Sequence, residues 1–251
     1  GGAGLMLLVL AALMRQSIRV PRAQWRDLII AALLNMTIFQ IGMTLGVHYF
    51  GAGRTVVIVY TMPLWAMLFA WPFLGERPTM VRLAALGFGL AGLAVLLSQE
   101  FHGLADAALG AVSTLVGAIA FGLGTVWIKR TRWTSDPTAI AGWQLVLGTL
   151  PVVPCWWFLG GGTDWAAISV ASWSGFTFNL IIANILAYFA WFRVLSVFPA
   201  SISGLGTLAV PIVGVLASAA VLGEVVGWRE ITALALIVAA LSLNLRSTTR
   251  E

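Results

Sequence analysis

Two stretches of the chain repeat one pattern and decide the fold. Residues 50–76 read FGAGRTVVIVYTMPLWAMLFAWPFLGE, and residues 198–224 read FPASISGLGTLAVPIVGVLASAAVLGE. A Phe, an Ala, a Pro and a closing Leu-Gly-Glu align between them, each 148 residues apart. The aligned pairs are Phe50 with Phe198, Ala52 with Ala200, Pro63 with Pro211, and Leu74-Gly75-Glu76 with Leu222-Gly223-Glu224. This pattern predicts an internal structural repeat.

Composition places the chain in a membrane. Of its 251 residues, 60% are hydrophobic and 9% are Asp, Glu, Lys or Arg, whereas a soluble domain carries roughly 25% charge. The apolar residues form continuous runs of about 20, the length of a membrane-spanning helix, without the alternation of a barrel. The sequence therefore predicts an all-α polytopic membrane protein. We expect a partial span at 1–14 and full spans at 28–49, 55–74, 83–98, 108–128, 138–159, 173–192, 200–222 and 231–245.

The basic residues orient these spans. When the loops are assigned to alternate sides, 12 of the 14 Lys and Arg residues fall on one side, and only Arg54 and Arg229 on the other. The basic side should be cytoplasmic, and should also hold the C-terminus. Glu76 then lies on the cytoplasmic side and Glu224 on the outer side, so the repeats are expected to be inverted. We predict cytoplasmic loops around Arg19, Lys129 and Arg193, and outer loops around Gly103 and Gly161.

The repeat also predicts how the chain is divided. The span beginning near Ala108 should have a partner 148 residues earlier, about 40 residues before Gly1. We therefore expect two inverted five-helix repeats, with the first helix and part of the second missing from this chain. The first repeat should cover 1–98, an outer loop linker 99–107, and the second repeat 108–251.

The doubled proline-centred helix ending in Leu-Gly-Glu, followed by the glycine-rich helix Leu83 to Leu97, resembles the drug/metabolite transporter superfamily. It is most similar to the ten-helix EamA-type permeases, and the likeness covers the whole chain. The resemblance implies transport of small molecules: its members include amino-acid and metabolite exporters and, more distantly, nucleotide-sugar carriers. The family name does not fix the substrate.

Uncharged polar side chains near the middle of the spans are the candidate substrate site. Such groups are costly in lipid unless they have partners or face water, and solutes bind near the midplane of inverted-repeat transporters. The substrate-binding candidates are Gln40, Tyr60, Thr61, Trp65, Asn184, Tyr188, Trp191 and Thr207. Gln40, Tyr60, Asn184 and Tyr188 are expected to line one central cavity. Pro63 and Pro211 are expected to kink their helices, and Glu76 and Glu224 to act as structural or gating anchors.

Several of these residues also have a plain structural interpretation. Ser and Thr in membrane helices commonly bond their own backbone or join helices, and we favour that role for Thr61, Ser203 and Thr207. Substrate contact is favoured for Gln40, Asn184 and Tyr188. Trp65 is as readily explained by packing, and the Gly42/Gly46 pair by close helix packing.

The pattern favours a secondary transporter of a bacterial inner membrane that exports neutral or zwitterionic metabolites, such as amino acids, by alternating access. No predicted span core contains Asp, Glu, Lys or Arg, which argues against phosphate carriage and carboxylate-driven proton coupling. The alternatives are a structural or assembly scaffold without transport, or a carrier of another class such as nucleotide sugars. An enzyme is not expected, because no nucleophile, base or ligand set comes together. We expect no cofactor, metal or nucleic acid, and a monomer or weak homodimer in the lipid bilayer.

Overall fold

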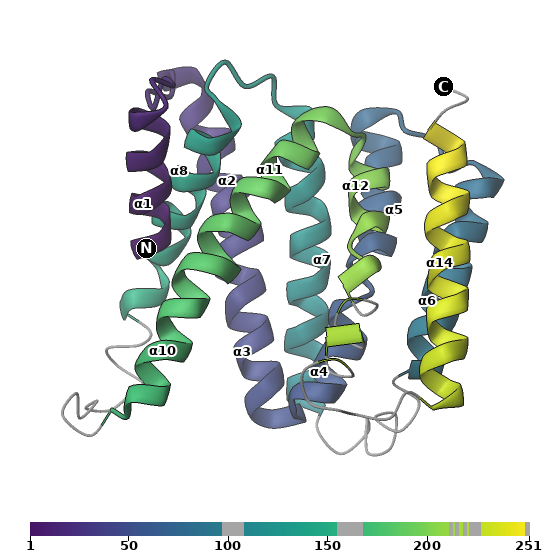
Figure 1. Ribbon diagram of the computed structural model, residues 1–251. Helices are drawn as coiled ribbons and strands as arrows, with labels where there is room; N and C mark the ends of the chain where they lie inside the picture. Colours follow the sequence, from purple (N-terminus) through teal and green to yellow (C-terminus); the bar gives the residue numbers. More distant parts are fainter. Residues whose placement is uncertain are drawn as a thin grey trace. The chain divides into compact units, whose positions relative to one another are not determined.

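The computed structural model describes residues 1–96, 108–154, 168–210 and 227–248, together with the single positions 213, 216, 217 and 220. Within these ranges every regular element is a helix (Figure 1). Three helices are long and apolar enough to cross a membrane: Arg22–Tyr49, Ala108–Arg130 and Ser172–Val197. Shorter apolar helices accompany them, and the protein is an all-α polytopic membrane protein, as the composition predicts.

The elements of the first half follow the predicted runs closely. They are α1 (Gly2–Leu13), η1 (Arg22–Gln24), α2 (Trp25–Ala32), η2 (Leu33–Ile38), α3 (Phe39–Phe50), α4 (Ala52–Val59), α5 (Met62–Leu74) and α6 (Met80–Leu96). The helix η1 is a short 3-10 turn, and η2 is a π-helical segment that continues α2 into α3 without a break. The predicted span 55–74 is thus built from two helices, α4 and α5, separated by a turn.

The second half has the same kinds of element. They are α7 (Ala108–Arg130), α8 (Pro137–Thr149), α10 (Val170–Phe178), the π-helical η5 (Asn179–Leu186), α11 (Ala187–Val197), α12 (Ala200–Gly206) and α14 (Trp228–Thr248). Asp136 caps α8, because its carboxylate accepts a hydrogen bond from the Thr138 N–H at 2.9 Å. Its Pro137 is the first residue of the helix, where the missing N–H costs nothing.

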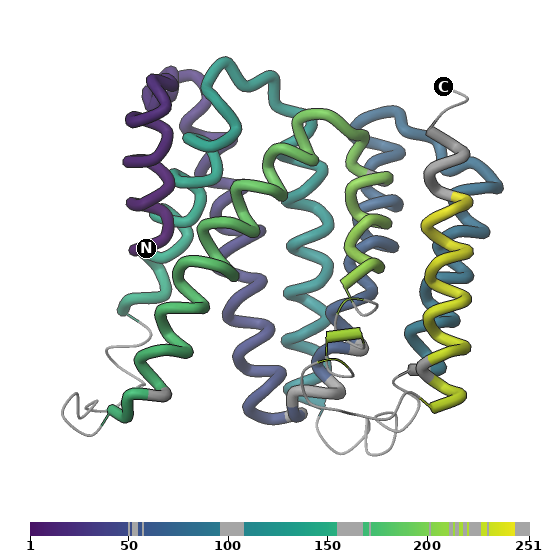
Figure 2. The backbone as a smooth tube through the Cα atoms, in the orientation of Figure 1, coloured from purple at the N-terminus to yellow at the C-terminus, as the bar shows by residue number. Residues whose placement is uncertain are grey.

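The chain divides into two compact units. Unit 1 contains residues 1–38 and 127–198, and unit 2 contains 39–126 and 199–251. Each unit therefore draws on both predicted repeats. Figure 2 follows the chain through them, from α1 and α2 of unit 1 to α14 of unit 2.

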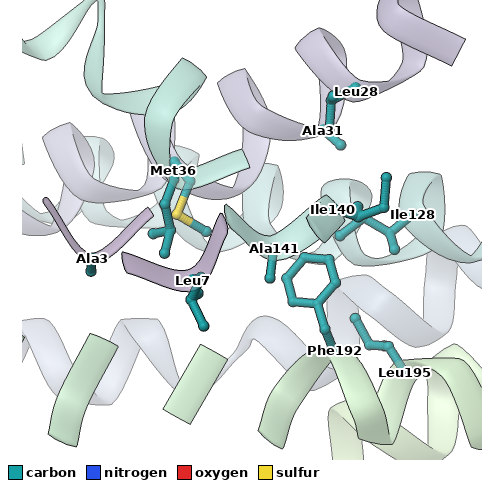
Figure 3. Packing of buried hydrophobic residues seen from close by; sticks show 11 residues of the cluster. Ala3, Leu7, Leu28, Ala31, Met36, Ile128, Ile140, Ala141, Phe192 and Leu195 are labelled. Atoms are coloured by element: carbon teal, nitrogen blue, oxygen red, sulfur yellow. The ribbon is translucent and has the colours of Figure 1, made fainter. Parts of the chain in front are cut away.

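Unit 1 is held together by a core between α1, α2, α8 and α11. Figure 3 shows Phe192 of α11 beside Ile140 and Ala141 of α8, with Leu7 of α1 close by. Glycines bring these backbones together: a Cβ added at Gly4 of α1 would lie 2.7 Å from the Gly142 carbonyl oxygen of α8. In lipid, where no hydrophobic effect drives helices together, such close van der Waals packing is the main source of attraction.

Unit 2 contains two helices that the predicted repeat makes equivalent. The helices α6 and α14 begin 148 residues apart and lie side by side (Figure 1). A Cβ at Gly89 would lie 3.6 Å from the Ala240 Cβ, and one at Gly92 would lie 3.0 Å from the Ala233 carbonyl oxygen. Residues later in α6 thus face residues earlier in α14, so these two repeat-equivalent helices are antiparallel. In an inverted repeat, equivalent helices of the two copies run in opposite directions across the membrane.

Candidate functional site

A break in the first proline-centred span places three of the candidate residues. The helix α4 ends at Val59 and α5 begins at Met62, with Pro63 as its second residue. A proline has no N–H and its ring clashes with the preceding turn, which favours a break at this point. The Thr61 hydroxyl donates to the Ile58 carbonyl at 2.7 Å and accepts from Trp65 Nε1 at 3.1 Å. Thr61 therefore closes the break and fixes Trp65, while Tyr60 is half-buried in the turn itself.

The second repeat breaks at nearly the same place. The helix α12 begins at Ala200, 148 residues after the start of α4, and ends at Gly206. The Thr207 hydroxyl donates to the Gly204 carbonyl at 2.7 Å, which is the local backbone bonding expected for this residue. The predicted kink residue Pro211 lies outside the described residues.

The two broken helices pack against each other within unit 2. Gly204 of α12 faces the start of α5: an added Cβ would lie 3.4 Å from the Ala66 Cβ and 3.6 Å from the Pro63 Cα. Ser203, next to this contact, is 3% exposed, and its hydroxyl oxygen has no protein partner among the described residues. The crossing of α5 and α12 is therefore flanked by uncharged polar groups from both repeats, one of them unpaired.

Gln40 lies on α3, two residues after the π-helical η2, and its side chain is exposed. The helix α3 packs against α7 through the glycine pair: Gly42 faces the Ser113 carbonyl, and Gly46 faces the Thr114 hydroxyl. The structure thus shows the close packing expected of Gly42 and Gly46. An exposed amide in the middle of a membrane helix needs water or a polar partner, because lipid offers no hydrogen bond.

Three candidates lie together in unit 1. Asn184 belongs to the π-helical η5, and its amide donates to the Asn179 carbonyl and to the Asn179 Oδ1, both at 2.8 Å. Tyr188 and Trp191 follow on α11, half-buried, with their rings against the unit 1 core. Asn184 is half-exposed, and its amide nitrogen is bonded within its own helix.

One fully buried amide is not among the predicted site residues. Gln144 of α8 has no exposed surface, and neither of its amide atoms has a protein partner among the described residues. Asn35 of η2 is 1% exposed, and its Oδ1 is likewise unpaired. The rule that selected Gln40, an amide deep within a predicted span, would have found Gln144 in 138–159. Unpaired buried amides are costly, so these positions invite a functional explanation.

Glu76 joins the two repeats. Gly75 adopts the left-handed conformation, with φ of 73°, and ends α5. The chain then turns so that the Glu76 carboxylate accepts a hydrogen bond from the Ala200 N–H, at 3.2 Å, at the start of α12. A carboxylate at a helix N-terminus satisfies a free N–H and complements the helix dipole. This contact gives the Leu-Gly-Glu ending a structural task, whereas its partner Glu224 lies outside the described residues.

The candidates are divided between the units. Gln40, Tyr60, Thr61, Trp65 and Thr207 belong to unit 2, and Asn184, Tyr188 and Trp191 to unit 1. The prediction that residues of both units line one cavity stays a prediction. Within unit 2, the structure brings α5 and α12 together at Pro63 and Gly204. Within unit 1, it places Asn184 on η5 and Tyr188 and Trp191 on α11, which follows directly.

Comparison with known proteins agrees with this architecture. A crystal structure with 19% sequence identity has the same fold, with a TM-score of 0.81, over 100% of this chain and 86% of that one. An uncharacterized transporter of Bacillus subtilis, YvbV, is 28% identical over 96% of this chain and 78% of its own length. A Salmonella typhimurium protein named "Probable amino-acid metabolite efflux pump" is 25% identical over 74% of this chain and 62% of its own.

The sequence model of the EamA-like transporter family matches residues 1–98 and 108–246, which is nearly the whole chain. These two matched segments carry the two proline-centred helices from which the resemblance started. The chain belongs to the EamA-like transporter family, within the drug/metabolite transporter superfamily.

Proposed function

We propose that this transporter exports small neutral or zwitterionic metabolites, such as amino acids, across a bacterial inner membrane by alternating access. The observation that carries the proposal is the crossing of α5 and α12, where the broken helices of the two repeats meet at Pro63 and Gly204. The polar groups beside it, Tyr60, Thr61 and Ser203, are all uncharged. Broken helices at the interface of inverted repeats are where such transporters bind their solutes.

The chemistry of the candidates supports a neutral or zwitterionic solute. Amide and hydroxyl groups can bind both an ammonium and a carboxylate group, and Tyr188 and Trp191 offer apolar surface for a side chain. A phosphate would call for Lys or Arg, and the predicted span cores contain neither. The relative named as an amino-acid metabolite efflux pump points to the same class of solute.

The geometry of the repeats supports alternating access. Each proline-centred helix breaks near its middle, α4 at Val59 and α12 at Gly206, and the repeat-equivalent helices α6 and α14 run in opposite directions. A movement that opens one repeat toward one side of the membrane therefore has a mirrored counterpart toward the other side. The distribution of basic residues supports a cytoplasmic C-terminus.

Counterflow in proteoliposomes tests the proposal. Purified protein is reconstituted into vesicles loaded with a mixture of unlabelled neutral amino acids, and uptake of each labelled amino acid is followed. We expect accumulation of at least one of them above protein-free vesicles. Counterflow of labelled nucleotide sugars into vesicles loaded with unlabelled nucleotide sugars would instead support the alternative carrier class, and no counterflow of either class by folded protein would support a scaffold.

Direction needs a second measurement. Cells that overproduce the transporter should release more of the identified solute into the medium than cells that produce a Pro63→Leu variant at equal membrane abundance. Faster uptake by the overproducing cells, with no change in release, would contradict export while leaving the class of solute intact.

A further inference from the structure

A cavity in unit 1 is lined by residues that have no part in the proposed transport site. It lies where α7 ends, between the segment that leads into α8 and the last turns of α11, and has a volume of about 320 Å³. Its polar part includes Lys129, Arg132 and Ser196, and its apolar part includes Ile140, Phe192 and Leu195. None of the described residues that line it is acidic. The nearest acid in sequence, Asp136, is bonded to the Thr138 N–H at the start of α8.

The two cations are placed differently. Lys129 is half-buried, and its Nζ donates to the Leu195 carbonyl at 2.9 Å, so the ammonium is fixed at the cavity wall with two further N–H groups. Arg132 is exposed, and its backbone carbonyl is held by Gln24 Nε2 at 2.7 Å. One fixed and one movable cation on the same wall favour an anion that carries several oxygen atoms.

The depth of the cavity, near the end of a membrane-spanning helix, favours a lipid as its ligand. Lys129 is the second-last residue of α7, a helix long enough to cross the bilayer, and the loop after it falls on the side that the basic residues assign to the cytoplasm. Trp133, which lines the cavity, donates from Nε1 to the Ile128 carbonyl at 2.8 Å, as an interfacial tryptophan does. Phospholipid headgroups and the upper ends of their acyl chains occupy this level.

We propose that this cavity binds an anionic phospholipid. The phosphate lies against Lys129 and Arg132, and the first acyl segments lie against Trp133 and Pro137, the half-buried apolar residues of the lining. A soluble phosphate would leave this apolar wall unused. The neighbouring cavity, of about 450 Å³, gives a contrast: it contains Arg26, Arg130 and Arg132, but also Asp27, whose carboxylate accepts from Trp127 Nε1 at 3.2 Å. The acid and the mainly polar lining of that cavity do not suit a lipid.

Native mass spectrometry of the purified protein in detergent tests the proposal directly. Phosphatidylglycerol, which is anionic, or phosphatidylethanolamine, which is zwitterionic, is added in steps, and the bound fraction is measured. We expect tighter binding of phosphatidylglycerol. Arg132→Gln should weaken it by about fivefold, equivalent to about 1 kcal/mol for one interfacial cation. Since the Arg132 side chain is exposed, its loss should leave folding intact.

Arg130→Gln is the matched control. It removes the same charge two residues away, but Arg130 lies over the Trp127 ring, at 5.3 Å, and lines the neighbouring cavity rather than this one. Lys129→Gln should weaken phosphatidylglycerol binding and Lys129→Arg should retain it, at equal thermal stability. Equal losses in Arg130→Gln and Arg132→Gln, or no preference for phosphatidylglycerol, would overturn the proposal. Displacement of the lipid by millimolar glycerol phosphate would show a site for a soluble anion instead.

Discussion

At the scale of single residues, Asn184 offers the sharpest distinction between a structural and a functional polar group. Its amide bonds to the Asn179 carbonyl and side chain within η5. If Asn184 also contacts the solute, Asn184→Ala should lower transport per folded molecule by about tenfold for each roughly 1.4 kcal/mol of binding lost. Tyr188→Phe, which keeps the ring in the unit 1 core, should raise the apparent KM without loss of stability. Both effects are measured by counterflow, normalised to folded protein.

Asn179→Ala is the control for this prediction. It removes one of the two acceptors of the Asn184 amide, but leaves Asn184 itself in place. We expect normal transport from it. If Asn179→Ala and Asn184→Ala lower transport equally, the pair acts by shaping η5 and the solute contact must be sought elsewhere.

Replacing Gln144 with an apolar residue should raise the stability of the protein and lower its transport activity. The Gln144 amide is fully buried without a protein partner among the described residues, and such a group costs about 1–3 kcal/mol. Gln144→Leu removes the amide at similar volume, so the free energy of unfolding should rise. We expect transport to fall, because a polar group kept at this cost serves the transport cycle. Thermal unfolding in detergent and counterflow measure the two effects, and a loss of stability would show that the amide is satisfied after all.

Glu76 should matter through its carboxylate oxygen. Glu76→Ala removes the acceptor of the Ala200 N–H and should destabilise the protein by about 0.5–2 kcal/mol, the usual cost of a lost helix cap. Glu76→Gln keeps an oxygen acceptor and loses only the attraction of the charge to the helix dipole, so it should cost less. Equal thermal stability of the two variants would contradict the capping role.

At the scale of helices, the sequence predicted which segments are apolar but not how each is wound. The span at 55–74 was expected to bend at Pro63, and the structure separates α4 from α5 just before it. Nothing in the composition of LLNMTI or NLIIANIL distinguishes a π-helical from an α-helical segment. The choice depends on which carbonyl each N–H meets, and that is decided by the packing of neighbouring helices. A helical wheel drawn with 3.6 residues per turn therefore places side chains after η2 and η5 on the wrong face of the helix.

The pairing of α6 with α14 can be tested by a disulfide. A Cβ at position 89 would lie 3.6 Å from the Cβ at position 240, within the roughly 3.5–4.5 Å of real disulfides. On a Cys155→Ser background, we expect Gly89→Cys with Ala240→Cys to crosslink rapidly under mild oxidation, once the Leu208 side chain has moved aside. Gly87→Cys with Ala240→Cys should not crosslink, because no atom of the structure faces Gly87 within 4 Å. The reverse order of reactivity would exclude the antiparallel pairing.

At the scale of the whole molecule, the sequence predicts which loops face the cytoplasm. The positions of the helices do not test that prediction. Single cysteines on the Cys155→Ser background can be probed in intact cells with a membrane-impermeant thiol reagent. Gly103→Cys should be labelled from outside, and Arg19→Cys only after the cells are permeabilised. Labelling of position 19 but not 103 in intact cells would invert the assignment.

The sequence could predict the all-α membrane class and the family, because both depend on patterns along the chain. It could not predict that 1–38 assembles with 127–198, or that Arg82, counted among the loop cations, is 3% exposed at the start of α6. These features depend on contacts between distant segments. The sequence does show Gln144 as an amide within a predicted span, but only the structure shows that this amide is buried without a protein partner among the described residues.

The two π-helical segments also bear on descent. The segments η2 and η5 end at Ile38 and Leu186, 148 residues apart, like the starts of α4 and α12. A π-helical turn arises when one residue is inserted into an α-helix, at a cost in hydrogen-bond geometry. Two separate insertions at the same place would each have had to survive that cost, whereas one insertion before the gene duplicated accounts for both. The shared position is what a single insertion, made before an ancestral half was duplicated, would leave in both halves of the chain.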